Sequence, residues 1–184
     1  MKVTEYLTSN IKGFQALTKQ IGEGLKLTLP WIDNTYTVVK AIREGSAVTP
    51  CILTSPTEYL SLLPSYELGN YSFFILEDPM VVDSNTAKVR GLSAKASLVI
   101  WFDMRKAYQT DELFNSEAVK LSVLEALHSI RIPNSRFEVS QVWEKPENIF
   151  KGFTTSLSKQ QFLMAPYYGF RFEGTLTFKL PCTT

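Results

Sequence analysis

The clearest pattern in the chain is an alternation of apolar and polar residues over residues 168–180, YGFRFEGTLTFKL. Its even positions are apolar except for Gly174, and its odd positions after Gly169 are polar or charged. A two-residue period places the two sets of side chains on opposite faces of a β-strand. One face must be buried, whereas the other is free to face water or a partner, as in an antiparallel sheet. Because a slip of one residue would exchange the faces, the pattern predicts a strand of fixed register.

A second alternating stretch, residues 93–104, predicts another long strand. One of its faces is apolar throughout, and the other is polar at its start but carries Val99 and Trp101. We therefore expect part of the second face to be covered as well. Shorter strands are predicted at residues 35–39, 48–53 and 137–143, with a turn at Glu44-Gly45-Ser46 between the first two.

Two stretches have the three- and four-residue spacing of an amphipathic helix. The first begins at Thr4 as the N-cap and ends at Gly22 and Gly24, after which alternating leucines at residues 25–29 favour a short strand. The second begins at Asp111 or Ser116 and ends at Ile130, before Pro133. Its buried side comprises Val119, Val123, Leu127 and Ile130.

Residues 54–92 are broken by prolines and glycines but contain bulky apolar pieces such as YSFFIL at residues 71–76. A segment this long and irregular is uncommon in a compact domain unless it has a function. It predicts an arm or extended hairpin that buries aromatic side chains against another subunit, or alternatively an excursion packed on its own core. Residues 149–164 are a candidate second arm. The predicted subunit-interface residues are Tyr59, Leu62, Tyr71, Phe73, Phe74, Phe150 and Phe153.

Together these elements predict a single α+β domain over residues 1–184, with a mainly antiparallel sheet, two packed helices and a protruding arm at residues 54–92. The chain is 45% hydrophobic and 20% charged, as is ordinary for a globular protein. A net charge of +1 provides no excess of positive charge of the kind that nucleic-acid-binding proteins use to bind phosphates. No apolar run indicates a signal peptide or a membrane span, so we expect no membrane association and a reduced state for Cys51 and Cys182.

The sequence predicts no catalytic, cofactor-binding or metal site. The single histidine, His128, falls near the end of the second helix, where a structural role is favoured. Gly22-Glu23-Gly24 lacks the preceding strand and the third glycine of a dinucleotide-binding loop. The alternative interpretation is a cytosolic enzyme or small-ligand module, with a cleft near Glu77 and Asp78 or near Glu144 and Glu147.

Three stretches carry a resemblance to a known class of proteins: LPWID at residues 29–33, SLVIWFDMRK at residues 97–106, and FLMAPYYGFRFEGTLTF at residues 162–178. They resemble stretches in small head–tail-region proteins of Bacteroides-type phages and prophages. The order of the predicted elements also resembles that of the tail-terminator and tail-completion fold. The likeness spans most of the chain and is poorest at residues 54–92.

The resemblance implies a structural virion protein, a tail terminator or head–tail connector, without catalysis. It implies copies of the chain in a six- or twelve-fold homo-oligomeric ring, assembled in the bacterial host cytoplasm and located at the head–tail junction of the virion. The implied neighbours are portal, connector or tail-tube proteins, and double-stranded DNA would pass through the ring without specific binding. Head-to-tail contacts close into such a ring when the rotation between copies allows it.

Overall fold

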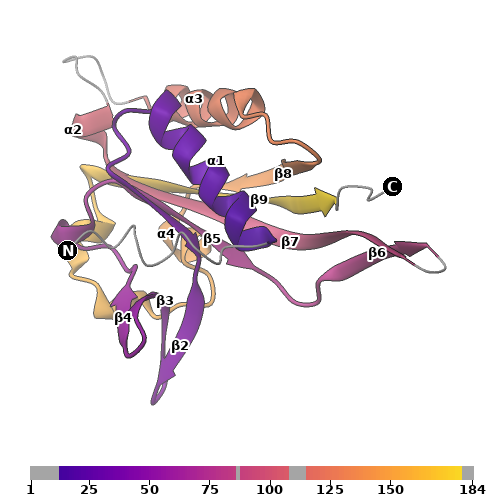
Figure 1. Ribbon diagram of the computed structural model, residues 1–184. Coiled ribbons are helices and arrows are strands. Elements are labelled where there is room, and N and C mark those ends of the chain that lie inside the picture. The colour runs from indigo at the N-terminus through magenta and orange to yellow at the C-terminus, as the bar shows by residue number, and fades with distance from the viewer. Residues whose placement is uncertain (1–12, 86–87, 108–114, 180–184) are drawn as a thin grey trace.

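A central β-sheet lies between two helices on one face and a smaller sheet with short helical turns on the other (Figure 1). The computed structural model describes residues 13–85, 88–107 and 115–179. This mixed content confirms the predicted α+β class. In the described residues the helices are α1 (Phe14–Thr28), α2 (Met104–Ala107), α3 (Ser116–Ser129) and α4 (Pro146–Ile149).

The strands divide between two sheets. The central sheet has the order β1-β5-β7-β9-β8, with β6 also paired to β7, and the small sheet has the order β2-β3-β4. Among the described strands, every neighbouring pair is antiparallel except that of β1 with β5. The strands are β1 (Asn34–Val38), β2 (Lys40–Glu44), β3 (Ala47–Ser55), β4 (Glu58–Ser61), β5 (Tyr71–Leu76), β6 (Val81–Asn85), β7 (Lys88–Asp103), β8 (Ser135–Trp143) and β9 (Tyr167–Lys179).

The two longest predicted strands are β7 and β9, and they pair with each other along thirteen positions, from Gly91 opposite Lys179 to Asp103 opposite Tyr167. Alternate side chains of both strands face the helices, as the pattern predicted. This helix-side core includes Leu98, Ile100, Phe102, Phe170, Phe172, Leu176, Leu17, Ile21, Leu25, Val119, Val123 and Ala126. Apolar burial of this kind is the main contribution to folding stability.

Gly174 interrupts the apolar face of β9 because the neighbouring strand approaches it closely. A Cβ atom at this position would lie 2.0 Å from the carbonyl oxygen of Glu138. The register of β8 against β9 shifts between Val139 and Gln141, so β8 bulges at this level. A side chain at Gly174 would force β8 away from the sheet.

The second face of the sheet is also covered, as the apolar residues Val99 and Trp101 indicated. Phe150 packs against Trp101 with ring centroids 5.3 Å apart, which places α4 beneath the sheet. This second core includes Val39, Ile52, Leu62, Leu63, Leu68, Tyr71, Phe73, Val99, Trp101, Ile149 and Phe150. Residues 149–164, the candidate second arm, instead lie against this core through Ile149, Phe150 and Phe162.

The prediction that the first helix ends at Gly22 and Gly24 is wrong. Helix α1 continues to Thr28, so Leu25 and Leu27 are helical rather than extended and Leu29 is the C-cap residue. Leu25 and Leu29 are both buried, four residues apart. A Cβ atom on Gly22 would lie 2.9 Å from the Thr35 side chain, and Gly24 faces Ile130 equally closely. The glycines therefore allow α1 to pack tightly against its neighbours. The predicted start at Thr4 lies outside the described residues.

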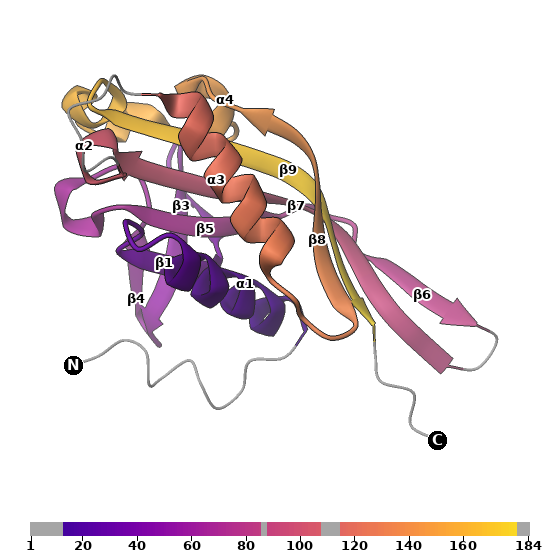
Figure 2. The ribbon, with the colours of Figure 1, turned by 90° about the horizontal axis from the view of Figure 1, so that it is seen from above.

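The predicted arm at residues 54–92 is shorter than expected. Its first part folds back on the body: β4 pairs with β3, and β5 pairs with both β1 and β7 inside the central sheet. The part that projects is the hairpin of β6 and the start of β7, at the right of Figures 1 and 2. From here on, "the arm" denotes β6 with the stretch of β7 that pairs with it, residues 81–85 and 88–93.

Candidate functional site

Five of the seven predicted interface residues lie in the interior of their own chain. Leu62, Tyr71, Phe73, Phe74 and Phe150 are each at most 1% exposed. Their hydrophobic area is covered by the central sheet, by α1 and by the segment around α4. Because nothing of them reaches the surface, they are not available to a second copy. The prediction of an interface at these five positions is corrected to a core role.

The other two predicted interface residues differ in exposure. Tyr59, on β4, is 51% exposed, whereas Phe153 is half-buried against the second core. Tyr59 lies at a groove of about 630 Å³ between the small sheet and the 3-10 turns that follow α4. Tyr66 and Leu157, both largely exposed, line the same groove. Tyr59 is thus the one predicted residue that stands at the surface.

The arm and Met80, the residue just before it, carry a cluster of exposed apolar side chains that the sequence analysis did not select. Met80, Val81 and Val82 are 50%, 59% and 53% exposed. Neighbouring exposed apolar residues of this kind normally mark a contact surface. The sequence signal was weak, because MVV is short and lies beside the more conspicuous YSFFIL, which proves to be a core strand.

One edge of β6 has no strand partner among the described residues. Strand β5 is paired on both sides, but β1 reaches only as far as Phe74, and β6 pairs with β7 alone. The outer edge of β6 therefore presents backbone N–H and C=O groups that another strand can bind. The arm combines an open strand edge with apolar side chains.

The opposite edge of the sheet is β8, which pairs only with β9 in the described part of the chain. A groove of about 760 Å³ runs beside it, between β8 and α3. The apolar side chains that line this groove are Ile21, Leu124, Leu127, Ile130, Ile132, Phe137 and Val139, and the charged ones are Glu125, Arg131, Arg136 and Glu138. Strand β8 thus presents a second open edge beside an apolar groove.

An ion-pair cluster ties α3 to the chain that follows β8. The Nζ atom of Lys120 lies 2.6 Å from a carboxylate oxygen of Glu117 and 2.6 Å from one of Glu144. Glu144 also accepts a hydrogen bond from the Tyr168 hydroxyl at 3.1 Å. The bonds to Glu117 and Glu144 raise the pKa of Lys120. Glu144 is thus held in a structural ion pair, while Glu147 is exposed in the first turn of α4.

The other candidate cleft lies at the base of the arm. Glu77, Asp78 and Lys95 line a hollow of about 440 Å³ there. Glu77 faces the buried Arg171, whose guanidinium lies 3.7 Å from the Glu77 carboxylate and 3.0 Å from that of Glu173. Arg171 also donates hydrogen bonds to the Ser97 hydroxyl and the Lys151 carbonyl. These contacts anchor the arm base to the segment beneath the sheet.

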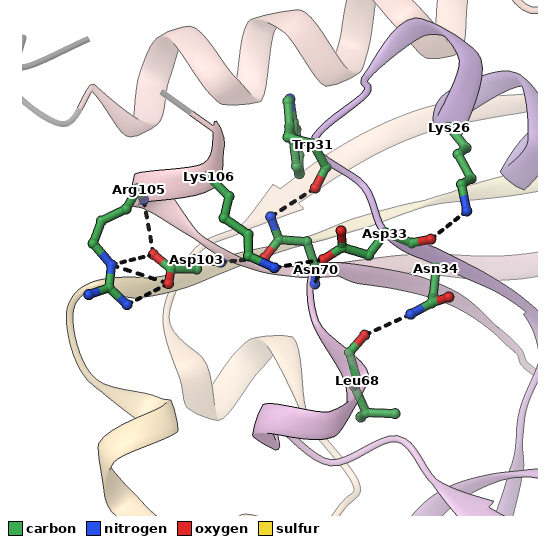
Figure 3. A network of polar contacts seen from close by, with 9 residues as sticks. All are labelled: Lys26, Trp31, Asp33, Asn34, Leu68, Asn70, Asp103, Arg105 and Lys106. Carbon is green, nitrogen blue, oxygen red and sulfur yellow. Dashed lines mark hydrogen bonds and ion pairs between the residues drawn. The ribbon is translucent and has the colours of Figure 1, made fainter. Parts of the chain in front are cut away.

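At the end of the sheet opposite the arm, Asn70 joins three strands (Figure 3). Its side chain accepts the backbone N–H of Asp103 and donates to the Trp31 carbonyl, both at 2.8 Å, and its own N–H donates to the Asp33 carboxylate at 2.8 Å. Lys106 lies 3.1 Å from the same Asp33 carboxylate. Sequence reasoning missed this network, because its members are scattered along the chain.

The electrostatics of this network favour ionised carboxylates. Hydrogen bonds from Arg105 lower the pKa of Asp103, although burial opposes them. Burial also acts to raise the pKa of Asp33, but bonds from the Asn70 N–H and Lys106 outweigh it, so that pKa is lowered too. Both carboxylates are engaged by cations or backbone groups, as expected for residues that fix the ends of strands.

The remaining reactive side chains are dispersed. His128 is exposed near the end of α3 and borders the groove beside β8. Cys51 is a free, buried thiol whose pKa is raised by burial, and Cys182 lies outside the described residues. Within residues 13–85, 88–107 and 115–179, no three metal-ligating side chains cluster. In the same part of the chain, no helix has the length and hydropathy to cross a bilayer.

Comparisons with known proteins add no relative to this description. The chain matches no protein-family model, and no curated protein matches it significantly.

Proposed function

We propose that the protein is a structural component of a phage virion that assembles with copies of itself into a ring at the head–tail junction, as a tail terminator or head–tail connector. The observation that carries the proposal is the arm. Strand β6, which carries the exposed Val81 and Val82, lies on a hairpin that projects from the body (Figure 2). Apolar side chains in such a position are stabilised when a partner covers them.

The resemblance of residues 29–33, 97–106 and 162–178 to head–tail-region proteins supports the same function. In the fold, the latter two stretches form the paired centre of the sheet, β7 with β9. The first leads from α1 into β1 and contributes Trp31 and Asp33 to the network around Asn70. The resembling segments thus belong to one architectural unit. A shared scaffold, rather than a shared reaction, is what they support.

The proposed partners follow from this position in a virion. Copies of the chain form the ring, portal, connector or tail-tube proteins lie above and below it, and double-stranded DNA passes through without sequence-specific contacts. A net charge of +1 is compatible with a passage that does not retain phosphate groups. Assembly takes place in the host cytoplasm, and the protein has no catalytic step to perform.

Two measurements test the proposal. Size-exclusion chromatography with light scattering should give a mass several times the 20.8 kDa of one chain, and negative-stain images should show closed rings. Mass spectrometry of phage particles purified from the host should detect the chain at several copies per particle. A monomer at high concentration that is also absent from purified particles would contradict the proposal.

A further inference from the structure

We propose that the ring contact is made by strand addition: β6 of one copy pairs with the free edge of β8 of the next copy and extends its central sheet. The inference rests on the proposed function, since it specifies how copies of this chain meet. It commits to one partner, a second copy, and to one pair of surfaces, the arm and the β8 edge with its groove.

Strand direction favours this pairing. Across the arm end of the sheet the order is β6-β7-β9-β8, and every neighbouring pair in it is antiparallel. Strands β6 and β8 therefore run in opposite directions at the two edges. A second copy that keeps the same orientation brings its β6 to β8 as an antiparallel partner, and the helices of both copies stay on the same side of the joined sheet. Antiparallel addition to a sheet edge is a common mode of recognition.

The lengths of the two edges are similar, and the proposed register places Val82 opposite Phe137 and Asp83 opposite Arg136, so that residues 81–84 of one copy pair with residues 135–138 of the next. Strand β6 has five residues, Val81–Asn85. On β8, five consecutive residues from Ser135 to Val139 pair regularly with β9 before the bulge begins. The bulge limits the regular edge available for addition to this stretch. An arm longer than β6 would have to cross the irregular part of β8.

The side chains on the helix side of the joined sheet are complementary. Val82 lies opposite Leu92, and Leu92 lies opposite Phe178, which belongs to the apolar face of β9 that packs on the helices. Phe137 lies opposite Leu176 on that same face and lines the groove beside β8. In the antiparallel pairing, Val82 of the arriving copy is therefore on the side of the groove. Covering it there removes an exposed apolar side chain from water.

Charge complementarity appears on the other side of the sheet. Asp83 lies opposite Gly91, and Arg136 lies opposite Thr177, so both side chains are on the face away from the helices. Strand β6 has one charged residue, Asp83, while Glu77 and Asp78 precede the arm and Glu77 pairs with Arg171 of its own chain. Residues 131–139 contain two arginines and one glutamate. The acidic residue of β6 thus meets a net basic stretch, in which Arg136 also pairs with Glu138 of its own chain. This charge arrangement favours pairing of β6 with β8 over pairing of two β6 strands.

The competing edge for β8 is β1, at the far side of the sheet. Strand β1 runs parallel to β5 and thus in the same direction as β6, so strand direction alone does not separate them. All five residues of β1 are half-buried, and α1 packs along the strand. The apolar residues of β6 are exposed, and so the arm is the better donor.

The contact joins two different surfaces, so each copy keeps one free arm and one free β8 edge until a ring closes. Cysteine pairs test this directly, in a Cys182→Ser background in which the remaining Cys51 is buried. One variant carries Asp83→Cys and the other Arg136→Cys, with Val81→Cys and Glu138→Cys as the adjacent positions on the same face. Each β6 cysteine variant is mixed with each β8 cysteine variant and mildly oxidised. A disulfide-linked dimer should form in at least one of these four mixtures.

Each variant alone should give no linked dimer, because the contact is head-to-tail. A control that pairs Arg136→Cys with Glu58→Cys, an exposed position on β4, should also stay unlinked. Light scattering on the same samples tests ring formation separately from the arm–β8 contact. Oligomers without any arm–β8 link would overturn the strand-addition contact and leave the ring proposal standing, whereas monomers throughout would overturn both.

Charge exchange gives a second, independent readout. Asp83→Arg alone should weaken association at least tenfold, because it faces Arg136 of the neighbour with a like charge. The double variant Asp83→Arg with Arg136→Asp should recover most of this loss. Circular dichroism checks that both variants are folded, as expected for two exposed residues. Equal association of the wild type, the single variant and the double variant would contradict the proposed contact between Asp83 and Arg136.

Discussion

At the residue scale, the structure separates side chains that the sequence presented as equivalent. Phe73 and Val81 both lie in the apolar middle segment, yet the first is fully buried and the second is 59% exposed. Sequence reasoning ranked them by size and aromaticity, which is why it placed the interface at the phenylalanines. Burial depends on which strands pair, and that is a long-range property which no local pattern around these residues contains.

The lowered pKa of Asp103 makes a prediction about acid stability. A carboxylate with a depressed folded pKa stabilises the fold above the ordinary aspartate pKa near 4, and this contribution is lost as the pH falls through the folded pKa. Asp103→Asn should therefore reduce the free energy of unfolding at pH 7, by less than a core substitution does, because it removes a charged hydrogen bond to Arg105, whose exposed side chain is screened by solvent. The difference from wild type should shrink steadily below pH 4.

Denaturant unfolding of both proteins at pH 7 and pH 2.5 measures this difference. Glu138→Gln is a suitable control, because Glu138 pairs with Arg136 at a site where both side chains are more than half exposed. A constant gap between Asp103→Asn and wild type at all pH values would show that the carboxylate's charge is not what stabilises the strand ends.

At the scale of elements, periodicity was enough to predict most of the structure. The alternation over residues 93–104 and 168–180 gave β7 and β9 with their correct faces, and the spacing of Val119 and Val123 gave α3. The failure at Gly22 and Gly24 has a physical cause. Glycine is a poor helix former on its own, so the sequence favoured an end there, but tertiary contacts with Thr35 and Ile130 require its small size.

Gly174 yields the sharpest prediction for an element. In Gly174→Ala the new methyl group meets the Glu138 carbonyl at a distance that no relaxed structure tolerates, so β8 must move away from β9. The expected loss is about 2–3 kcal/mol of unfolding free energy. Thermal unfolding checks it, with Gln141→Ala on the exposed side of β8 as a control that should cost less than about 0.5 kcal/mol. Equal stabilities would mean that the bulge accommodates a side chain.

At the scale of the whole molecule, the sequence predicted the α+β class and an arm within residues 54–92, but not which part of that segment projects. Phe73 looked superfluous for one domain because the sequence indicated cover over Val99 and Trp101 but not the extent of the second core under the sheet. That core depends on residues 62–68 and 149–162, whose spacing is irregular and carries no helical or strand period. The candidate interface therefore had to come from the structure.

Substitutions in the second core and on the arm should affect stability and assembly separately. Phe73→Ser should lower the free energy of unfolding by about 3–5 kcal/mol, since it removes a fully buried ring from the second core. The double variant Val81→Ser with Val82→Ser should unfold at nearly the wild-type temperature but elute as a monomer. Thermal unfolding and light scattering on both variants decide the matter. A Phe73→Ser protein that is folded as stably as wild type but monomeric would show that Phe73 acts at the subunit interface.

The place of β9 in the chain has a consequence for biosynthesis. It lies between β7 and β8, and both precede it in the sequence, so neither can complete its hydrogen-bonding ladder until residues 167–179 have left the ribosome. Until then the nascent chain exposes the apolar faces of two unjoined strands, and such intermediates are prone to aggregate or to be held by chaperones. The sheet is thus completed only once β9 has been synthesised, and newly made chains become competent to join other copies only after that step.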